Sequence, residues 1–263
     1  MRRYKLYILL FIITIQLLFS LSLIAQRNSE LFVGAGVSQT HVRDKSMSPL
    51  MYSGVGVVAD AGFFHISAGK TECFHLSFQK ARLQNSGGNG ADYLAFSFKN
   101  HTFYHKESDP RGKMIFGWSN NNFLGSYTKD TYGNFPNRFF YYTSFGPAGS
   151  YLVDFMVFER TFIAELKADI QLLGFYLRPS YVSSEPDGYL DPANSGFSGF
   201  LNSIDFFYPG NALDAGTDIS LKYIFGSGNA VSINYRYQYS FIKFPESVNS
   251  STGNWTVSLI TKL

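Results

Sequence analysis

Strict alternation of apolar and polar residues in the C-terminal third is the feature that most restricts the possible folds of this chain. Between Val231 and Phe241 every odd-numbered residue is apolar or aromatic, and every even-numbered residue is polar. Successive side chains of a β-strand point to opposite faces, so this segment predicts a strand with one apolar and one polar face. Residues 218–225 alternate in the same way, and the link at residues 226–229, Gly-Ser-Gly-Asn, predicts a tight hairpin between the two strands.

The same period of two recurs earlier in the chain. Residues 162–172 alternate, as do shorter stretches at 74–79, 93–99 and 113–118. Aromatic residues make up 18% of the chain and charged residues only 16%, whereas ordinary soluble domains have about 25% charged residues. Such a chain has ample apolar area to bury, so the composition excludes intrinsic disorder and the pattern predicts an all-β fold.

The first 25 residues have the layout of a secretory signal peptide. Arg2, Arg3 and Lys5 precede an almost continuous apolar run, and Ala25 is a small residue in position for cleavage. A polar segment and then β-patterned sequence follow at once, which favours cleavage. The alternative is a retained membrane anchor, since the run is long enough to span a bilayer.

Cleavage after Ala25 would remove three basic residues and no acidic one. The mature chain, residues 26–263, then has 22 − 3 = 19 basic and 19 acidic residues and a formal charge of zero. Excess positive charge is the electrostatic signature of nucleic-acid binding, so a neutral mature chain argues against a nucleic-acid partner. The single cysteine, Cys73, excludes an intrachain disulfide framework and a cysteine-rich metal site.

Beyond residue 25 no apolar run approaches 18 residues, so no transmembrane helix is predicted there. Two folds remain: a soluble secreted β-sandwich that hides its apolar faces, and an outer-membrane β-barrel that turns them to lipid. Strands of about 9–11 residues, Tyr and Phe near strand ends, and short connections alternating with longer ones favour the barrel. We predict a single transmembrane antiparallel up-and-down β-barrel over residues 26–263.

The last strand supports the barrel through a resemblance. Residues 255–263, Trp-Thr-Val-Ser-Leu-Ile-Thr-Lys-Leu, alternate and run to the last residue. This segment resembles the closing strand of bacterial outer-membrane β-barrels, except that it ends on Leu263 instead of an aromatic residue and that Thr261 interrupts the apolar series. The signal ending at residues 22–26 and the Tyr-, Phe-, Asn- and Gly-rich chain look like Bacteroidota export. The resemblance implies the outer membrane of a Gram-negative bacterium and identifies a broad class, not a specific family.

With the C-terminus placed in the periplasm, the strands can be counted backward along the chain. If residues 52–70 form a hairpin that turns at residues 60–62, the barrel has about twelve strands; ten is the alternative, since single-chain bacterial barrels have even strand numbers. The expected strands are 253–263, 229–243, 217–226, 161–181, 150–159, 138–146, 113–128, 91–106, 72–85, 52–70 and 30–41.

The connection over residues 182–216 is the longest and is expected on the external side. Loops of this length are usually functional or disordered. A loop folded onto its own barrel rim is the simpler interpretation, and the alternative is a loop that caps the barrel or whose aromatic residues contact other outer-membrane proteins. The aromatic residues are Tyr189, Phe197, Phe200, Phe206, Phe207 and Tyr208, and the acidic ones are Glu185, Asp187, Asp191, Asp205 and Asp214. Carboxylates suit Ca²⁺, but EF-hand spacing is absent, so we predict no metal and no cofactor.

The polar strand faces are expected to line the barrel interior. A small bore lined by charged side chains can fill with ion pairs, which argues against a wide general porin. The residues expected in this interior network are Glu165, Lys167, Asp169, Lys222 and Arg236. The expected role is therefore structural, that of an accessory subunit, or narrow-pore transport, and outer-membrane lipid is an expected partner.

One pattern raises the alternative of an enzyme. His75 and Ser77 share a strand face as H-x-S, which resembles the base–nucleophile pair of outer-membrane phospholipases and lipid A deacylases, with Asn89 as an orienting group. Those enzymes expose the pair on the lipid-facing wall. Here the apolar residues of the 74–78 segment are expected to occupy that wall, which leaves His75 and Ser77 in the lumen. We therefore expect a barrel without enzymatic activity, and a lipid esterase or deacylase is the alternative.

Two further histidines share a strand face. His101 and His105 would suit a two-histidine metal site, but no carboxylate or cysteine lies nearby on that face. Packed or solvated histidines are therefore favoured over a metal site. Cys73 is expected to be a lone thiol that is buried or lies next to lipid.

Overall fold

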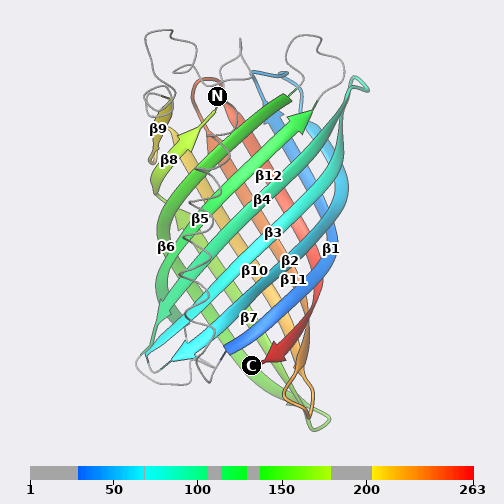
Figure 1. The fold of residues 1–263 in the computed structure, drawn as a ribbon, viewed down its shortest axis with the longest axis vertical. Coiled ribbons are helices and arrows are strands. Elements are labelled where there is room, and N and C mark those ends of the chain that lie inside the picture. Colours follow the sequence, from blue (N-terminus) through cyan, green and yellow to red (C-terminus); the bar gives the residue numbers. More distant parts are fainter. Residues whose placement is uncertain (1–28, 68, 106–113, 129–136, 179–202) are drawn as a thin grey trace, which may run out of the picture.

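The computed structural model describes residues 29–67, 69–105, 114–128, 137–178 and 203–263, and the predicted signal peptide lies outside these ranges. The chain folds into a closed antiparallel β-barrel (Figure 1). Its strands are β1 (Ser29–Asp44), β2 (Tyr52–Ser67), β3 (Lys70–Asn85), β4 (Gly90–Tyr104), β5 (Met114–Thr128), β6 (Asn137–Val157), β7 (Arg160–Gln171), β8 (Leu173–Leu177), β9 (Ile204–Phe207), β10 (Ala212–Ile224), β11 (Ala230–Ile242) and β12 (Val248–Lys262). No helix among the described residues is long and apolar enough to cross a membrane.

Ten strands close the ring. From β1 to β7 each strand pairs with the next, β7 pairs with β10, and β12 returns to pair with β1 along almost its whole length. Two short strands lie outside the ring. β8 pairs with residues 141–145 of β6, whereas β7 pairs with residues 148–157 of the same strand. β9 pairs with β8. The predicted all-β up-and-down barrel is confirmed, with ten strands in the ring and twelve in total.

Three of the expected strand boundaries are wrong. The expected strand 161–181 is divided, because β7 ends at Gln171 and β8, which begins at Leu173, pairs with β9 instead of β10. β2 runs unbroken from Tyr52 to Ser67, so no hairpin forms at residues 60–62. The segments 138–146 and 150–159, expected as two strands, form the single strand β6. β6 pairs with β5 throughout the Gly-Pro-Ala stretch at residues 146–148, and this ladder outweighs the local turn preference. Pro147 lies where the other neighbour of β6 changes from β7 to β8, a position that tolerates a missing N–H.

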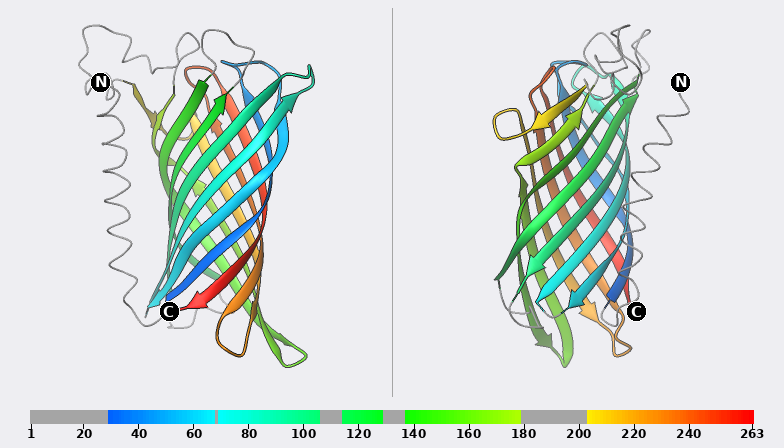
Figure 2. Two further views of the ribbon diagram at one scale, coloured as in Figure 1. Left: turned by 45° about the vertical axis from the view of Figure 1, so that its right-hand side comes forward. Right: turned by 60° about the vertical axis from the view of Figure 1, so that its left-hand side comes forward.

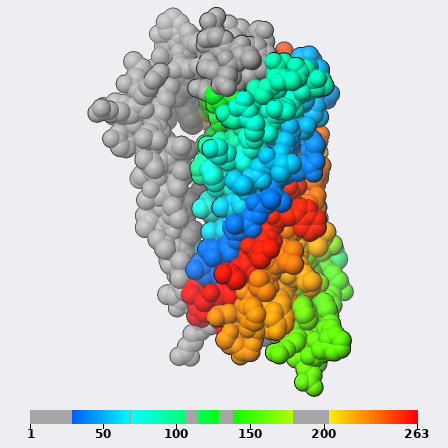
Figure 3. All heavy atoms as spheres, turned by 90° about the vertical axis from the view of Figure 1, so that its right-hand side faces the viewer, coloured from blue at the N-terminus to red at the C-terminus, as the bar shows by residue number. Residues whose placement is uncertain are grey.

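The outer wall is apolar and the inner wall is largely polar. On β12, Trp255 and Val257 are 56% and 55% exposed, whereas Thr256 and Ser258 between and beside them are buried. Figure 3 shows this side as a continuous wall in which side chains close the spaces between strands. The alternative of a soluble β-sandwich is contradicted, because a sandwich hides its apolar faces and this closed ring exposes them.

The two ends of the barrel differ in their connections. Ser29 and Leu263 meet at one end, where Leu263 N donates to Ser29 O at 2.9 Å. We call this the terminal end; its β6–β7 hairpin turns at Phe158 and Glu159 and extends beyond the other strands (Figure 2). The opposite end, called the loop end, has the connection from β8 to β9, between Leu177 and Ile204.

Two glycines make room for aromatic rings inside the bore. In the ladder Phe32 lies opposite Gly62, and Phe140 lies opposite Gly125. A Cβ on Gly62 would lie 2.6 Å from the Phe32 ring, and one on Gly125 would lie 2.5 Å from the Phe140 ring. Because glycine has no side chain, each ring can lie over the neighbouring backbone and fill the interior.

Candidate functional site

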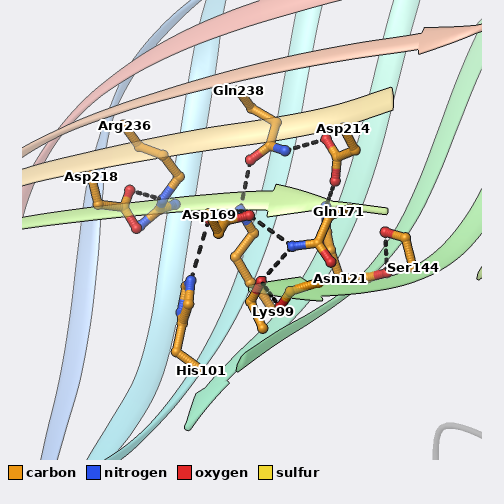
Figure 4. A network of polar contacts seen from close by, with 12 residues as sticks. Lys99, His101, Asn121, Ser144, Asp169, Gln171, Asp214, Asp218, Arg236 and Gln238 are labelled. Atoms are coloured by element: carbon orange, nitrogen blue, oxygen red, sulfur yellow. Dashed lines mark hydrogen bonds and ion pairs between the residues drawn. The ribbon is translucent and has the colours of Figure 1, made fainter. Parts of the chain in front are cut away.

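The interior of the barrel is divided along its axis into three levels. A cavity of about 450 Å³ occupies the terminal end. A network of charged and amide side chains crosses the middle (Figure 4). A cluster of buried aromatic and aliphatic side chains fills the loop end. These three levels are the candidate functional site, since they decide whether anything can pass through or bind inside the barrel.

Lys99 and Asp169 form the centre of the middle network. Lys99 Nζ lies 3.0 Å and 3.2 Å from the two carboxylate oxygens of Asp169, and both side chains are almost fully buried. Gln171 Nε2 donates to Asp169 Oδ2 at 2.8 Å, and His101 Nε2 lies 3.3 Å from Asp169 Oδ1. A buried charge is tolerated only when it is paired and hydrogen-bonded, and Asp169 meets both conditions.

A second carboxylate, Asp214, extends the network across the bore. Asn121 Nδ2 donates to Asp214 Oδ2 at 2.7 Å, and the Gln238 amide donates to Asp214 Oδ1. Lys99 Nζ also donates to Gln238 Oε1 at 2.8 Å, which joins the two carboxylates through one lysine and one amide. Side chains from β4, β5, β7, β10 and β11 therefore meet in the middle of the barrel (Figure 4).

Arg236 connects two further acidic groups. Its Nε donates to Asp218 Oδ1 at 2.6 Å, and its Nη1 lies 3.5 Å from Asp60 Oδ2. His75 Nε2 lies 3.3 Å from Asp60 Oδ1. Asp60, Asp169 and Asp218 each lie beside a basic side chain, whereas Asp214 is held by the amides of Asn121 and Gln238.

The cavity at the terminal end carries two further ion pairs. Lys167 Nζ lies 2.8 Å from Glu165 Oε2 and 4.8 Å from the centre of the Phe64 ring. Lys222 Nζ donates to Glu30 nearer the strand ends. Apolar side chains make up much of the remaining lining, among them Phe32, Ile66, Phe103, Ile115, Leu152 and Ile260. The cavity is therefore amphipathic.

The loop end is closed by packing and by a buried ion pair. Arg178 Nη2 lies 2.9 Å from Asp44 Oδ1, and Arg178 also donates to the backbone oxygen of Glu246. Met47, from the β1–β2 connection, is buried against the aromatic cluster beneath it. We define the aromatic layer as Tyr52, Tyr93, Tyr127, Phe140, Tyr142, Tyr176 and Phe207, each of which is at most 1% exposed.

The aromatic layer differs from the expectation that Tyr and Phe near strand ends form outer girdles. Tyr93 has the same strand parity as Lys99, and Tyr127 has the same parity as Asn121, so both rings point inward. In the sequence, both tyrosines fall on the same strand face as the polar residues, and this was the signal that they point inward. The large number of aromatic residues concealed it, because both faces of these strands carry aromatic side chains.

All five residues expected in the interior network point into the bore, but they do not form one cluster. Glu165 contacts Lys167, whereas Asp169, Lys222 and Arg236 each pair with other residues. Sequence reasoning missed Lys99, Asn121, Gln171, Asp214 and Gln238 as members of the network. Strand parity identifies Lys99 as an inward-pointing residue of β4. Asp214 was missed because it was assigned to the 182–216 loop, whereas it is buried in β10.

The His75 and Ser77 pair faces the interior. Both residues are buried, and His75 stacks on the Phe32 ring with centroids 5.7 Å apart. The neighbour of the His75 ring nitrogen is Asp60, across the ladder. Asn89 lies in the β3–β4 turn, where its backbone N–H donates to Asn85 Oδ1 at 3.0 Å. Neither side chain is therefore presented to lipid on the outer wall.

The remaining candidates are separated in the fold. His101 contacts Asp169 inside the barrel, while His105 Nε2 lies 3.1 Å from Thr71 Oγ1 at the terminal end. In the described part of the chain no group of three or more His, Cys, Asp or Glu residues is placed to hold a metal ion. Cys73 is buried in the lining of the large cavity.

The expected 182–216 loop is shorter than the sequence suggested. β9 begins at Ile204 and β10 at Ala212, so Asp205 belongs to a strand. Phe206 is 69% exposed and Tyr208 49%, whereas Phe207 is buried in the aromatic layer. Tyr189, Phe197, Phe200, Glu185, Asp187 and Asp191 lie outside the described residues.

Comparison with known proteins gives matches to solved structures alone. No protein-family model matches the chain, and no curated protein matches it. Neisserial surface protein A is 13% identical, with a TM-score of 0.35 over 89% of this chain and 97% of that one. The transport unit of the autotransporter AIDA-I from Escherichia coli is 9% identical, with a TM-score of 0.40 over 90% and 89%. The outer membrane protease OmpT from Escherichia coli is 6% identical, with a TM-score of 0.39 over 91% and 98%.

Proposed function

We propose that this protein is an outer-membrane β-barrel with a closed bore and a structural or accessory-subunit role. Its ten-stranded ring has no open edge, and it turns an apolar wall outward and a polar wall inward. That orientation matches a transmembrane barrel, in which lipid contacts the apolar side chains and backbone groups are paired around the ring. A chain with this surface requires a membrane to cover it.

The observation that carries the proposal is the filling of the bore at two levels. The large cavity ends at His75, Lys99 and Arg236, which belong to its lining, and beyond them lies a second cavity of only about 40 Å³. Further toward the loop end, the aromatic layer and Met47 pack together. A bore filled with paired charges and rings offers no wide aqueous path, unlike the water-filled lumen of a porin.

Conductance in planar lipid bilayers tests this role. The purified protein, inserted in both orientations, is expected to give no discrete channel events. A variant with Tyr93→Ala, Tyr127→Ala and Tyr142→Ala, which removes three rings of the aromatic layer, is expected to conduct or to insert with excess noise. Stable, discrete conductance by the unmodified protein would contradict the closed bore.

Narrow-pore transport is the second candidate, and one observation favours it. His75, Lys99 and Arg236 line both the large and the small cavity, so these side chains lie at the boundary between the two spaces. If they act as a gate for small ions, Lys99→Ala should introduce conductance without any change to the aromatic layer. Silence of the Lys99→Ala variant, with conductance only after removal of the rings, would favour the structural role.

An accessory role also requires a contact surface. Phe206 and Tyr208 at the loop end are exposed aromatic side chains of the kind that anchor protein interfaces. We propose them as contacts for another outer-membrane protein. Replacement of both by Ser should reduce co-purification of a partner after mild detergent extraction, and unchanged co-purification would remove these two residues from the proposal.

A further inference from the structure

Three asparagines lie on the outer wall of the barrel, where lipid-facing side chains are otherwise mostly apolar. Lys99 and His101 are buried in the interior, so Asn100 between them points outward. Ser119 and Asn121 are likewise buried inside, and Asn120 and Asn122 therefore point outward from β5. Asn100 lies directly opposite Asn120 in the β4–β5 ladder, so the three amides are neighbours. We call Asn100, Asn120 and Asn122 the outer asparagine patch.

The patch lies within the apolar band and not at its edge. Along β5 the outward residues before it are Met114, Phe116 and Trp118, and the next one after it is Leu124. β4, β5 and β6 run side by side on one face of the barrel (Figure 1). The β6 residue opposite Asn122 is Thr143, which adds a hydroxyl to the patch.

The three amides satisfy one another only in part. Asn122 Nδ2 donates to Asn120 Oδ1 at 2.7 Å, and Asn120 Nδ2 donates to the backbone oxygen of Ser144 at 2.9 Å. Asn100 Oδ1 is buried beneath the surface of the outer wall and accepts no hydrogen bond from any described residue. Each asparagine amide offers two N–H donors and one oxygen with two lone pairs, more than these two bonds use.

Lipid cannot complete these hydrogen bonds. Hydrocarbon has no donors or acceptors, so a polar group that faces it without a partner is unfavourable. Polar side chains within the membrane are one of the forces that join membrane-spanning elements, because they hydrogen-bond across the contact. The patch therefore needs a polar partner at the same depth in the bilayer.

A second copy of this chain supplies such a partner. An interface with two-fold symmetry brings the same patch of both subunits together, so it must be self-complementary. An amide group meets this condition, since it both donates and accepts hydrogen bonds, whereas a patch of a single charge would repel itself. Trp118 and Phe145 stack with centroids 5.1 Å apart beside the patch and are 47% and 45% exposed, which adds flat apolar area for the contact.

We propose that two copies of this barrel associate in the membrane through β4, β5 and β6, with the outer asparagine patch at the centre of the interface. The dimer lies in the plane of the bilayer with its two-fold axis along the membrane normal. This inference goes beyond the closed-bore role and does not depend on it, because a conducting barrel would present the same outer wall.

The test measures association of the full-length mature barrel in phosphatidylcholine vesicles. Donor- and acceptor-labelled protein is mixed, and energy transfer is recorded as the lipid-to-protein ratio increases. The test variant is Asn120→Leu with Asn122→Leu, and the matched control is Thr217→Leu, an outward polar residue on β10. Leucine suits a lipid-facing position in both variants, so each should fold, and a heat-dependent shift on gels verifies the closed barrel.

The unmodified protein and the Thr217→Leu control are expected to transfer energy above the level of random proximity. The patch variant should lose association by about tenfold, which corresponds to about 1.4 kcal/mol. An Asn122→Cys variant in a Cys73→Ala background should cross-link to itself on mild oxidation, and Thr217→Cys in the same background should not. Monomeric behaviour of the unmodified protein, or equal association of the patch variant and the control, would overturn the proposal.

Discussion

At the scale of single residues, the interior depends on pairs of buried opposite charges. Lys99 and Asp169 are 6% and 3% exposed, and they come from strands that are not neighbours in the ring. The pair is joined to Asp214 through Gln238, so loss of one member leaves several groups without their partners. Breaking such a pair is strongly destabilising, whereas replacing both members by apolar residues is often tolerated.

We therefore predict that Lys99→Met lowers the free energy of unfolding by about 3–5 kcal/mol, because Asp169 keeps its charge without a counter-ion. Lys99→Met combined with Asp169→Leu should recover much of that loss. Urea titration of the folded barrel in detergent measures both changes. Lys80→Met is the control, since Lys80 is exposed on the outer wall. A Lys99→Met variant as stable as the Lys80→Met control would contradict the importance of the pair.

The second prediction at this scale concerns catalysis. His75 and Ser77 are buried and face the interior of the barrel, and the neighbour of the His75 ring nitrogen is Asp60. We expect hydrolysis of phospholipid or lipid A by the purified protein to stay at background, and Ser77→Ala to leave it unchanged. Measurable hydrolysis that disappears in Ser77→Ala would show that the pair reaches a lipid substrate after all.

At the scale of strands, hydrogen bonding to neighbouring strands determined strand boundaries that the local sequence did not predict. Alternation correctly predicted the inward and outward faces of β7, β11 and β12, because side-chain direction in a strand follows parity directly. Turn residues were misleading at Asp60 and Pro147, because Asp60 pairs with strands on both sides and Pro147 pairs with Trp118 of β5. The contacts of Lys99 and Asp214 were not predictable, because they depend on the closure of the ring and on the stagger of its strands.

Glycine positions give a prediction for individual strands. Gly125→Val should lower the free energy of unfolding by about 1–3 kcal/mol, because the new side chain would collide with the Phe140 ring inside a filled bore. Gly226→Ala, in the β10–β11 turn, is the control, since a Cβ there meets nothing within 4 Å. Urea midpoints in detergent compare the two. If both variants unfold at the wild-type midpoint, the fit of Phe140 over Gly125 does not contribute to stability.

At the scale of the whole molecule, the barrel has an apolar wall, a filled bore and two unlike ends. The terminal end joins Ser29 to Leu263 and holds the β10–β11 turn, while the β3–β4 turn lies at the loop end. In bacterial outer-membrane barrels the short turns face the periplasm and the longer loops face outward. This convention fixes the expected orientation of the protein in the membrane.

Orientation is tested by two matched cysteine variants. Ser86 and Ser227 are exposed in turns at opposite ends, and the native Cys73 is buried. On intact cells a membrane-impermeant maleimide should label Ser86→Cys and spare Ser227→Cys, and permeabilised cells should show labelling of both. The reverse pattern on intact cells would mean that the loop end faces the periplasm.

The most direct test of the central claim is the electrophoretic mobility of the mature chain with and without boiling, after extraction from membranes with detergent. A closed barrel with paired strands resists SDS until heated, so the unboiled sample should migrate as a compact species and the boiled sample as an unfolded chain. Release as a monomer into detergent-free buffer, with the same mobility before and after boiling, would contradict a barrel whose apolar wall is covered by lipid.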